Sequence, residues 1–143
     1  MTPDDLRVAG FLDARRALSF LEELPAGQSW VGDLSASADP DQALLQAVRL
    51  READPGLVDA LSRDERARRR VCAILGGSQW LGDYVIADPA RAAAINEDPG
   101  DPREVLYEAV GVRTVGRGVW VAAREATADD LRAAYRRVLL HLA

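Results

Sequence analysis

Apolar residues recur at helical spacing along most of the chain, in short runs separated by residues that start and stop helices. Six of the seven prolines follow aspartate or threonine. An aspartate or threonine at the N-cap accepts hydrogen bonds from unpaired backbone N–H groups, and proline in the first turn has no N–H to leave unpaired. These pairs are typical of helix starts, and they involve Pro3, Pro40, Pro55, Pro89, Pro99 and Pro102.

Short helices follow from these signals. Gly76-Gly77 and Gly111 are expected to end the helices before them. Glu104 and Asp130 lie where a capping box has its acid. The predicted helices cover residues 2–9, 13–24, 40–53, 55–61, 64–75, 78–87, 89–96, 102–110 and 127–142.

The spacing also predicts which side of each helix is buried. In the last helix, Arg132, Arg136 and Arg137 lie opposite the apolar stripe, where they contact a neighbouring domain or form plain surface. The expected inward residues are Ala17, Leu18, Leu21, Leu24, Leu44, Leu45, Val48, Val71, Ile74, Leu75, Leu131, Tyr135, Val138 and Leu142, with Ala134 and Leu139 flanking the last four.

Residues 112–124 depart from the helical pattern. Val115, Val119, Trp120 and Val121 surround Gly116-Arg117-Gly118, and this fits either a small β-hairpin or an extended crossing loop. Strands do not alternate with helices elsewhere, which disfavours a doubly wound α/β fold, and no fixed-period repeat is present. The expected fold is mainly α: an orthogonal bundle of short helices with a small β-hairpin or extended loop at 112–124.

Length and charge limit the functional classes. A chain of 143 residues is one domain or a piece of a larger one. Its net charge of -5 disfavours a nucleic-acid-binding surface. All 18 basic residues are arginine, so a Walker-type lysine and a Schiff-base lysine are excluded. Neither a signal peptide nor a membrane-spanning run is recognised, so the cytoplasm is the expected location and no membrane partner is expected.

Cysteine and histidine are too few for most metal and thiol chemistry. Cys72 cannot form an intrachain disulfide, and its apolar neighbours favour a buried side chain. Its only potential histidine partner is His141, and one cysteine with one histidine is too small a set for a zinc site.

The segment 75–89 offers a more specific candidate site. A Gly77-Ser78 turn could hold a triphosphate in a polymerase-β-type nucleotidyltransferase, with Asp83 as a metal ligand behind it. Such sites need two carboxylates at i and i+2 on a strand, and here Val85 occupies the second position. Trp80, Leu81, Tyr84 and Val85 have helical spacing, so Ser78 is interpreted as an N-cap and Gly82 as a site of close helix packing.

Other candidates are weaker. Arg66, Arg68, Arg69 and Arg70 could receive a phosphate, but on a helix they spread over more than half the circumference, which favours a solvated face. The Gly116–Gly118 segment lacks the spacing of a dinucleotide-binding loop and is interpreted as a turn. Trp30, Trp80 and Trp120 are interpreted as core or interface anchors.

Two segments resemble a known family. Residues 71–89 read VCAILGGSQWLGDYVIADP, similar to the L-x-x-x-L-G-x-S-x-x-L-(G/A)-D-x-(L/V)-x-x-(H/D/N)-P segment of the bifunctional glutamine synthetase adenylyltransferase/adenylyl-removing enzyme. Residues 131–143 read LRAAYRRVLLHLA and resemble its L-R-x-x-(Y/W)-R-R helix. Residues 9–17, AGFLDARRA, fit the N-terminal end of actinobacterial members. Asp88 stands where many members have histidine, which affects an N-cap.

The resemblance implies a large enzyme with two nucleotidyltransferase domains, one adding AMP from ATP to glutamine synthetase and one removing it by phosphorolysis. It implies magnesium and ATP for the full-length enzyme, with glutamine synthetase and PII signalling proteins as partners. The G-G-R-E-L-x-x-x-S-D-x-D catalytic segment of the family is not in this sequence. No catalytic, cofactor-binding or metal-binding residue is therefore assigned here.

Two functional hypotheses follow. In the first, residues 1–143 are the helical N-terminal part of the adenylyl-removing domain, a fragment that packs on the nucleotidyltransferase core and on the rest of its own chain. The end of the sequence inside an apolar helix supports this hypothesis. In the second, the chain is a stand-alone, non-enzymatic helical protein-interaction module. A third, a minimal nucleotidyltransferase, requires strands around Gly77 and Asp83.

Overall fold

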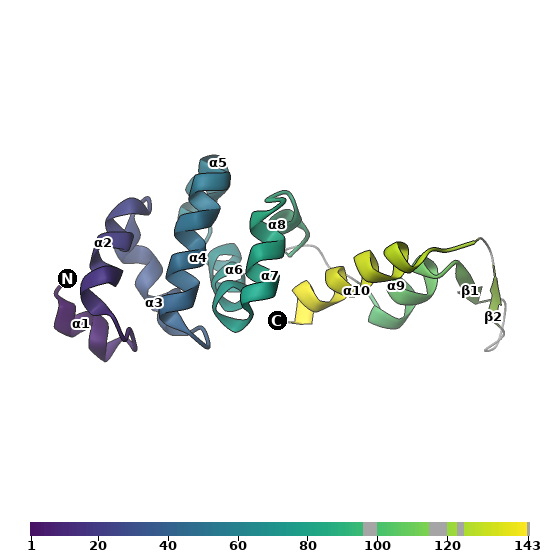
Figure 1. Cartoon of the computed structure of the whole chain (residues 1–143), viewed down its shortest axis with the longest axis horizontal. Coiled ribbons are helices and arrows are strands. Elements are labelled where there is room, and N and C mark those ends of the chain that lie inside the picture. The colour runs from purple at the N-terminus through teal and green to yellow at the C-terminus, as the bar shows by residue number, and fades with distance from the viewer. Residues whose placement is uncertain (96–99, 115–119, 123–124, 143) are drawn as a thin grey trace. The chain divides into compact units, whose positions relative to one another are not determined.

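The computed structural model describes residues 1–95, 100–114, 120–122 and 125–142. These residues fold mainly as short helices, which confirms the expected mainly α class (Figure 1). The chain divides into two compact units, Met1–Asn96 and Glu97–Leu142. None of the described helices is both long and apolar enough to cross a membrane.

Helix α4 is the central element of the first unit, because α2, α3, α5, α6 and α7 all pack against it. The chain winds around it through short helices that are visible in order in Figure 1. In sequence these are α1 (Pro3–Val8), α2 (Ala14–Glu23), a 3-10 helix η1 (Gly27–Trp30), α3 (Val31–Ser35), α4 (Pro40–Ala53), α5 (Pro55–Arg63), α6 (Glu65–Gly77), α7 (Gln79–Ile86) and α8 (Arg91–Ala94).

Polar N-caps start α1, α2, α4, α5, α6 and α7, as the sequence predicts. Thr2 and Asp5 form a capping box on α1. The carboxylates of Asp39 and Asp54 accept N–H bonds in front of Pro40 and Pro55. The same type of bond is made by Asp13, Asp64 and Ser78.

Some predicted boundaries are wrong. Helix α6 continues through Gly76 and Gly77 because Ser78 serves as both its C-cap and the N-cap of α7. Helix α5 is two residues longer than predicted. Pro89 lies in a turn and α8 begins only at Arg91, whose N–H binds the carbonyl of Asp88. The Asp98-Pro99 pair lies outside the described residues.

Two elements were not predicted at all, η1 and α3. They follow Ala26, which has a left-handed backbone with φ of 50°. No Asp-Pro or Thr-Pro pair precedes them, and neither η1 nor α3 has a side-chain cap. They are ordered instead by burial, because Trp30 and Leu34 are fully inaccessible to solvent.

The core of the first unit contains most of the predicted inward residues. Leu45 is an exception and is 37% exposed, because it faces a groove beside α2 rather than the core. Leu18 is half-buried. The largest fully buried side chains are Trp30, Leu6, Leu34, Leu44, Leu50, Ile74, Leu75, Gln46, Val58, Val71, Val85 and Cys72.

The second unit consists of α9 (Pro102–Ala109), β1 (Val112–Thr114), β2 (Trp120–Ala122) and α10 (Ala128–Leu142). The two strands pair antiparallel, with Val112 opposite Ala122, so the hairpin alternative is correct for these residues. Their connection, 115–119, lies outside the described residues. Gly111, with φ of 71°, follows the C-cap of α9. The Asp101 carboxylate caps α9 through the N–H of Arg103.

Helix α10 begins with the capping box that the sequence predicts, since Thr127 and Asp130 exchange side-chain and backbone bonds. Its buried side differs from the prediction. Val138 is buried as expected, and Ala134, which was expected only to flank the stripe, is buried too, but Leu131 and Tyr135 are 43% and 54% exposed.

Candidate functional site

The segment 75–89 forms a helix junction. The Ser78 hydroxyl accepts the N–H of Leu81 at 3.3 Å, and its extended backbone (φ -156°) turns the chain from α6 into α7. Asp83 lies within α7. The helical interpretation of Gly77, Ser78 and Asp83 is confirmed, and the strands required by the minimal nucleotidyltransferase hypothesis are not found there.

The Asp83 carboxylate joins α7 to α4. Its Oδ1 atom lies 2.6 Å from Nη1 of Arg49 and 3.5 Å from Nε2 of Gln46. Gln46 is almost fully buried, and its own oxygen accepts a bond from Arg49 at 3.0 Å. A Cβ on Gly82 would lie 3.2 Å from the Gln46 amide carbon, so the predicted close packing at Gly82 is confirmed. The side chains that bind Asp83 therefore lie on a neighbouring helix, and its role is structural.

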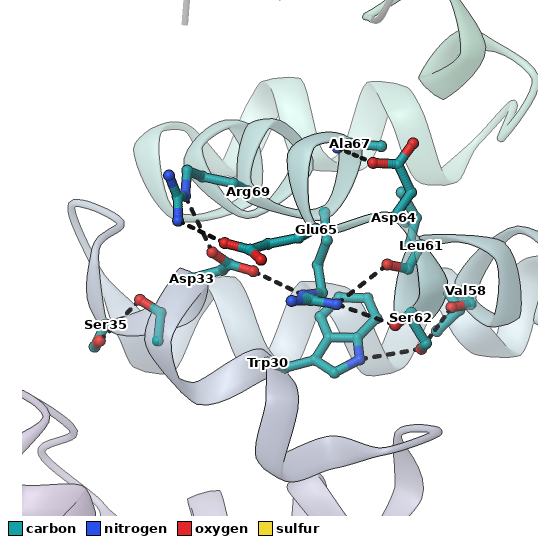
Figure 2. Close-up of polar contacts among 12 residues, drawn as sticks. Trp30, Asp33, Ser35, Val58, Leu61, Ser62, Asp64, Glu65, Ala67 and Arg69 are labelled. Carbon is teal, nitrogen blue, oxygen red and sulfur yellow. Dashed lines mark hydrogen bonds and ion pairs between the residues drawn. The ribbon is translucent and has the colours of Figure 1, made fainter.

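A second polar cluster is buried between α3, α5 and α6 (Figure 2). The side chains of Asp33 and Arg68 are 5% and 8% exposed, and Nε of Arg68 lies 2.7 Å from Oδ2 of Asp33. The Arg68 Nη1 atom donates to the carbonyls of Leu61 and Ser62 at 3.4 and 3.1 Å. These carbonyls belong to the last turn of α5, where a cation is stabilised by the helix dipole.

Trp30 lies against the same cluster (Figure 2). Its indole Nε1 donates to the Pro25 carbonyl at 3.1 Å and to the Ser62 hydroxyl at 3.2 Å. The Arg68 guanidinium carbon is 5.9 Å from the Trp30 ring centroid. A buried charge is tolerated only when it is paired and hydrogen-bonded, and here Asp33, two carbonyls and an aromatic face meet that condition.

The predicted solvated face of arginines is wrong at Arg68. The sequence contained a signal for this, because Arg68 precedes Val71 by three residues and Cys72 by four, so it shares the apolar face of α6. Arg69 is exposed and bridges Asp33 and Glu65. Arg70 donates to the carbonyl of Ile95. Arg68 and Arg69 thus share the carboxylate of Asp33, and Arg70 binds a backbone carbonyl, so three of the four guanidiniums are engaged by groups of the protein itself.

Cys72 is buried, as expected. Burial raises the pKa of its thiol to about 12, with a further contribution from the charge of Asp33 and an opposing one from Arg68. A thiol that holds its proton so firmly is a poor nucleophile at neutral pH. The side chain of His141 lies outside the described residues.

Among the described residues, no group of three or more histidine, cysteine, aspartate or glutamate side chains could hold a metal ion.

Trp30 is a core residue, whereas Trp80 is half exposed on α7 and stacks on Tyr84 at a centroid distance of 5.9 Å. The side chain of Trp120 and the Gly116–Gly118 segment lie outside the described residues.

The fold and these contacts define a class of protein: a mainly helical domain whose buried charges join helices to one another. Comparison with known proteins is more specific. The chain is 32% identical to the bifunctional glutamine synthetase adenylyltransferase/adenylyl-removing enzyme of Leifsonia xyli subsp. xyli, across 94% of its length. It is 36% identical to that of Streptomyces avermitilis across 86%, and 35% to that of Streptomyces coelicolor across 94%.

The chain is therefore a relative of the bifunctional glutamine synthetase adenylyltransferase/adenylyl-removing enzymes of actinobacteria, which confirms the resemblance seen in its motifs. It spans only 12–14% of the length of these three relatives. No family model matches the chain. No solved structure matches it either.

Proposed function

We propose that this chain is the N-terminal helical segment of an enzyme that adenylylates and deadenylylates glutamine synthetase. The observation that carries the proposal is the similarity of nearly the whole chain to one small portion of much longer enzymes. The order of the two motifs, at 71–89 and 131–143, supports the same assignment.

In this proposal the segment supports the nucleotidyltransferase core and performs no chemistry itself. The sequence has no S-D-x-D segment, and Asp83 is engaged by Arg49. The described residues offer no ligand set that fits magnesium. Magnesium and ATP, which the family resemblance implies for the full-length enzyme, belong in this proposal to the nucleotidyltransferase core. The segment's own contribution is mechanical: α4, α6 and α7 pack together, one ion pair joins α4 to α7, and another joins α6 to α3.

The proposal places the protein in the cytoplasm, with glutamine synthetase as the substrate of the whole enzyme and PII signalling proteins as its regulators. The names of the relatives support glutamine synthetase as that substrate. The PII partner and the location rest on the family resemblance.

A chimera tests the assignment. The aligned portion of the Streptomyces coelicolor enzyme would be replaced by residues 1–143, and both adenylyl addition and removal would be assayed on glutamine synthetase. We expect the chimera to retain both activities, and an enzyme carrying an unrelated helical domain of equal length to lose adenylyl removal. The isolated chain should release no AMP from adenylylated glutamine synthetase in the presence of phosphate and magnesium.

The alternative is a stand-alone helical interaction module. A soluble, folded chimera that lacks adenylyl removal, combined with a stable and folded isolated chain, would favour that module. Release of AMP by the isolated chain would contradict both hypotheses, since each assigns no chemistry to these residues.

A further inference from the structure

Helix α10 carries a wide apolar stripe, and only part of this stripe is buried. Ala134 and Val138 are buried, and α10 packs against α9. Leu131 and Tyr135 are four residues apart, so they are neighbours on the helix surface, yet they are 43% and 54% exposed. These two side chains form the Leu131–Tyr135 face, which neither the caps nor the buried ion pairs explain.

The exposure of this face departs from the pattern of the sequence. Helical spacing marks Leu131 and Tyr135 as inward residues, on the same stripe as Val138. A single exposed leucine or tyrosine is ordinary on a protein surface. An exposed pair that continues a buried stripe is instead typical of a surface that another part of a protein covers.

The second unit gains little stability from a core of its own. Helix α9 buries no residue. The unit spans Glu97–Leu142, only a little more than the roughly 40 residues below which a disulfide, a metal or a partner surface is usually needed. It has no cysteine, and no metal-binding group lies among its described residues. A partner surface is the remaining source of stability.

The face is too small for a partner that binds from solution. The exposed parts of one leucine and one tyrosine amount to roughly 200 Å². Stable interfaces between separate molecules bury about 800 Å² on each partner, and association also loses translational and rotational freedom. A segment of the same polypeptide avoids most of that loss, because its effective concentration is in the millimolar range. The small area therefore favours an occupant within the same chain over a second copy or a separate protein.

The proposed function supplies such an occupant. The chain spans 12–14% of the length of three relatives, and the proposal assigns it to the N-terminal part of an enzyme of that kind. Helix α10 is the last element of the chain. In such an enzyme the polypeptide that follows starts at the end of the helix that carries the Leu131–Tyr135 face, so only a short connection separates the two.

We propose that the Leu131–Tyr135 face of α10 packs against the nucleotidyltransferase core of the same enzyme molecule. Apolar side chains of the core contact Leu131 and Tyr135, and their burial stabilises the second unit through the hydrophobic effect. This inference rests on the proposed function, from which it takes its occupant. It identifies the surface through which the segment supports the core.

Single thiols on α10 test the contact in two contexts. One is the isolated chain, and the other is the full-length chimera in which residues 1–143 replace the aligned portion of the Streptomyces coelicolor enzyme. Leu131→Cys and Tyr135→Cys each place a thiol on the face. Ala133→Cys is the matched control, because Ala133 is exposed and lies on the opposite side of α10 from Leu131. The natural Cys72 is buried and lies in a different helix.

The rate of alkylation by N-ethylmaleimide is read for each peptide by mass spectrometry. We expect the thiols at positions 131 and 135 to react at least about tenfold more slowly in the chimera than in the isolated chain. The thiol at position 133 should change less than about twofold. Hydroxyl-radical oxidation of the unsubstituted Tyr135 makes the same comparison without a variant that could disturb the contact.

The outcomes separate this inference from the proposed function. A chimera that keeps both activities but reacts at positions 131 and 135 as fast as the isolated chain would overturn the inference alone. A folded chimera without adenylyl removal would overturn both, because the inference would lose its occupant. Protection already present in the isolated chain would also overturn the inference. If that protection rises with protein concentration, the occupant is a second copy, and otherwise residues 1–143 cover the face themselves.

Discussion

The two units of the chain use the same helix caps but differ in how their helices are joined. In the first unit, polar contacts link helices far apart in sequence, such as Gln42 with the Leu75 carbonyl and Arg68 with Asp33. In the second unit, Asp101 and Thr127 cap their helices equally well, yet α9 buries no residue. Capping decides where a helix begins, whereas burial and contacts between helices decide how firmly it is held.

The largest expected effect is on the alkylation rate of Cys72, which reports the opening of the first unit. Because burial raises its thiol pKa from 9.0 to about 12, the thiolate population at pH 8 is about a thousandfold lower than in the unfolded chain. Alkylation of the native chain should be slower by at least that factor, as followed by mass spectrometry. Rapid labelling at low urea would show that the first unit opens easily.

The same pKa shift predicts a pH dependence of stability. The folded state holds the Cys72 proton more tightly than the unfolded state, so this contribution is fully present below pH 9.0 and declines as the pH rises towards about 12. In the variant Cys72→Ala this alkaline decline should be smaller. Urea unfolding measured across that pH range compares the two.

The next largest effect concerns the buried ion pair. Asp33→Ala leaves Arg68 buried without its carboxylate, which should lower the free energy of unfolding by about 3–5 kcal/mol. Urea unfolding followed by tryptophan fluorescence reports the change, because Trp30 lies beside the cluster. The matched control is Glu65→Ala, which removes an exposed partner of Arg69 and should change stability by less than about 1 kcal/mol.

Equal losses in Asp33→Ala and Glu65→Ala would contradict the distinction between a buried and an exposed ion pair. If Asp33→Ala lowered the free energy of unfolding only slightly, water would have to reach Arg68. The first unit would then be no more tightly joined than the second.

Adjacent glycines at the end of α6 provide a fourth prediction. A Cβ at Gly76 would lie 2.5 Å from the Ser37 hydroxyl and 2.9 Å from the Asp39 carbonyl, whereas a Cβ at Gly77 meets nothing within 4 Å. Gly76→Ala should therefore cost about 1–3 kcal/mol through overpacking. Gly77→Ala should be neutral or stabilise by up to about 1 kcal/mol, because alanine favours helix. Thermal unfolding compares the two variants.

Most helix starts could be predicted from the sequence because caps act over three residues. Asp39 and Asp54 bind N–H groups that are close to them in sequence, so the pattern contains both partners. The length of α6 could not be predicted in the same way. Its two glycines are a local stop signal, but Ser78 places the end of α6 and the start of α7 at one residue.

The polar clusters were less predictable because their partners are distant in sequence. Asp33 and Arg68 are 35 residues apart, and Arg49 and Asp83 are 34 apart. The sequence does place Arg68 on the apolar face of α6, but nothing in it indicates that Asp33 is the partner of Arg68. The helical role of Asp83 was predictable, since its neighbours have helical spacing, whereas its pairing with Arg49 required the packing of α7 on α4.

The smallest expected effect tests the second unit directly. Val138 is buried on α10, whereas Leu131, about two turns earlier on nearly the same face of the helix, is 43% exposed. Val138→Ala removes two buried methyl groups and should lower the free energy of unfolding by about 1–2 kcal/mol. Leu131→Ala should change it by less than about 0.5 kcal/mol, since an exposed leucine loses little on truncation and alanine favours helix. If Leu131→Ala proved the more costly in urea unfolding, Leu131 would be covered in solution, and the second unit would be held more firmly than its exposed side chains indicate.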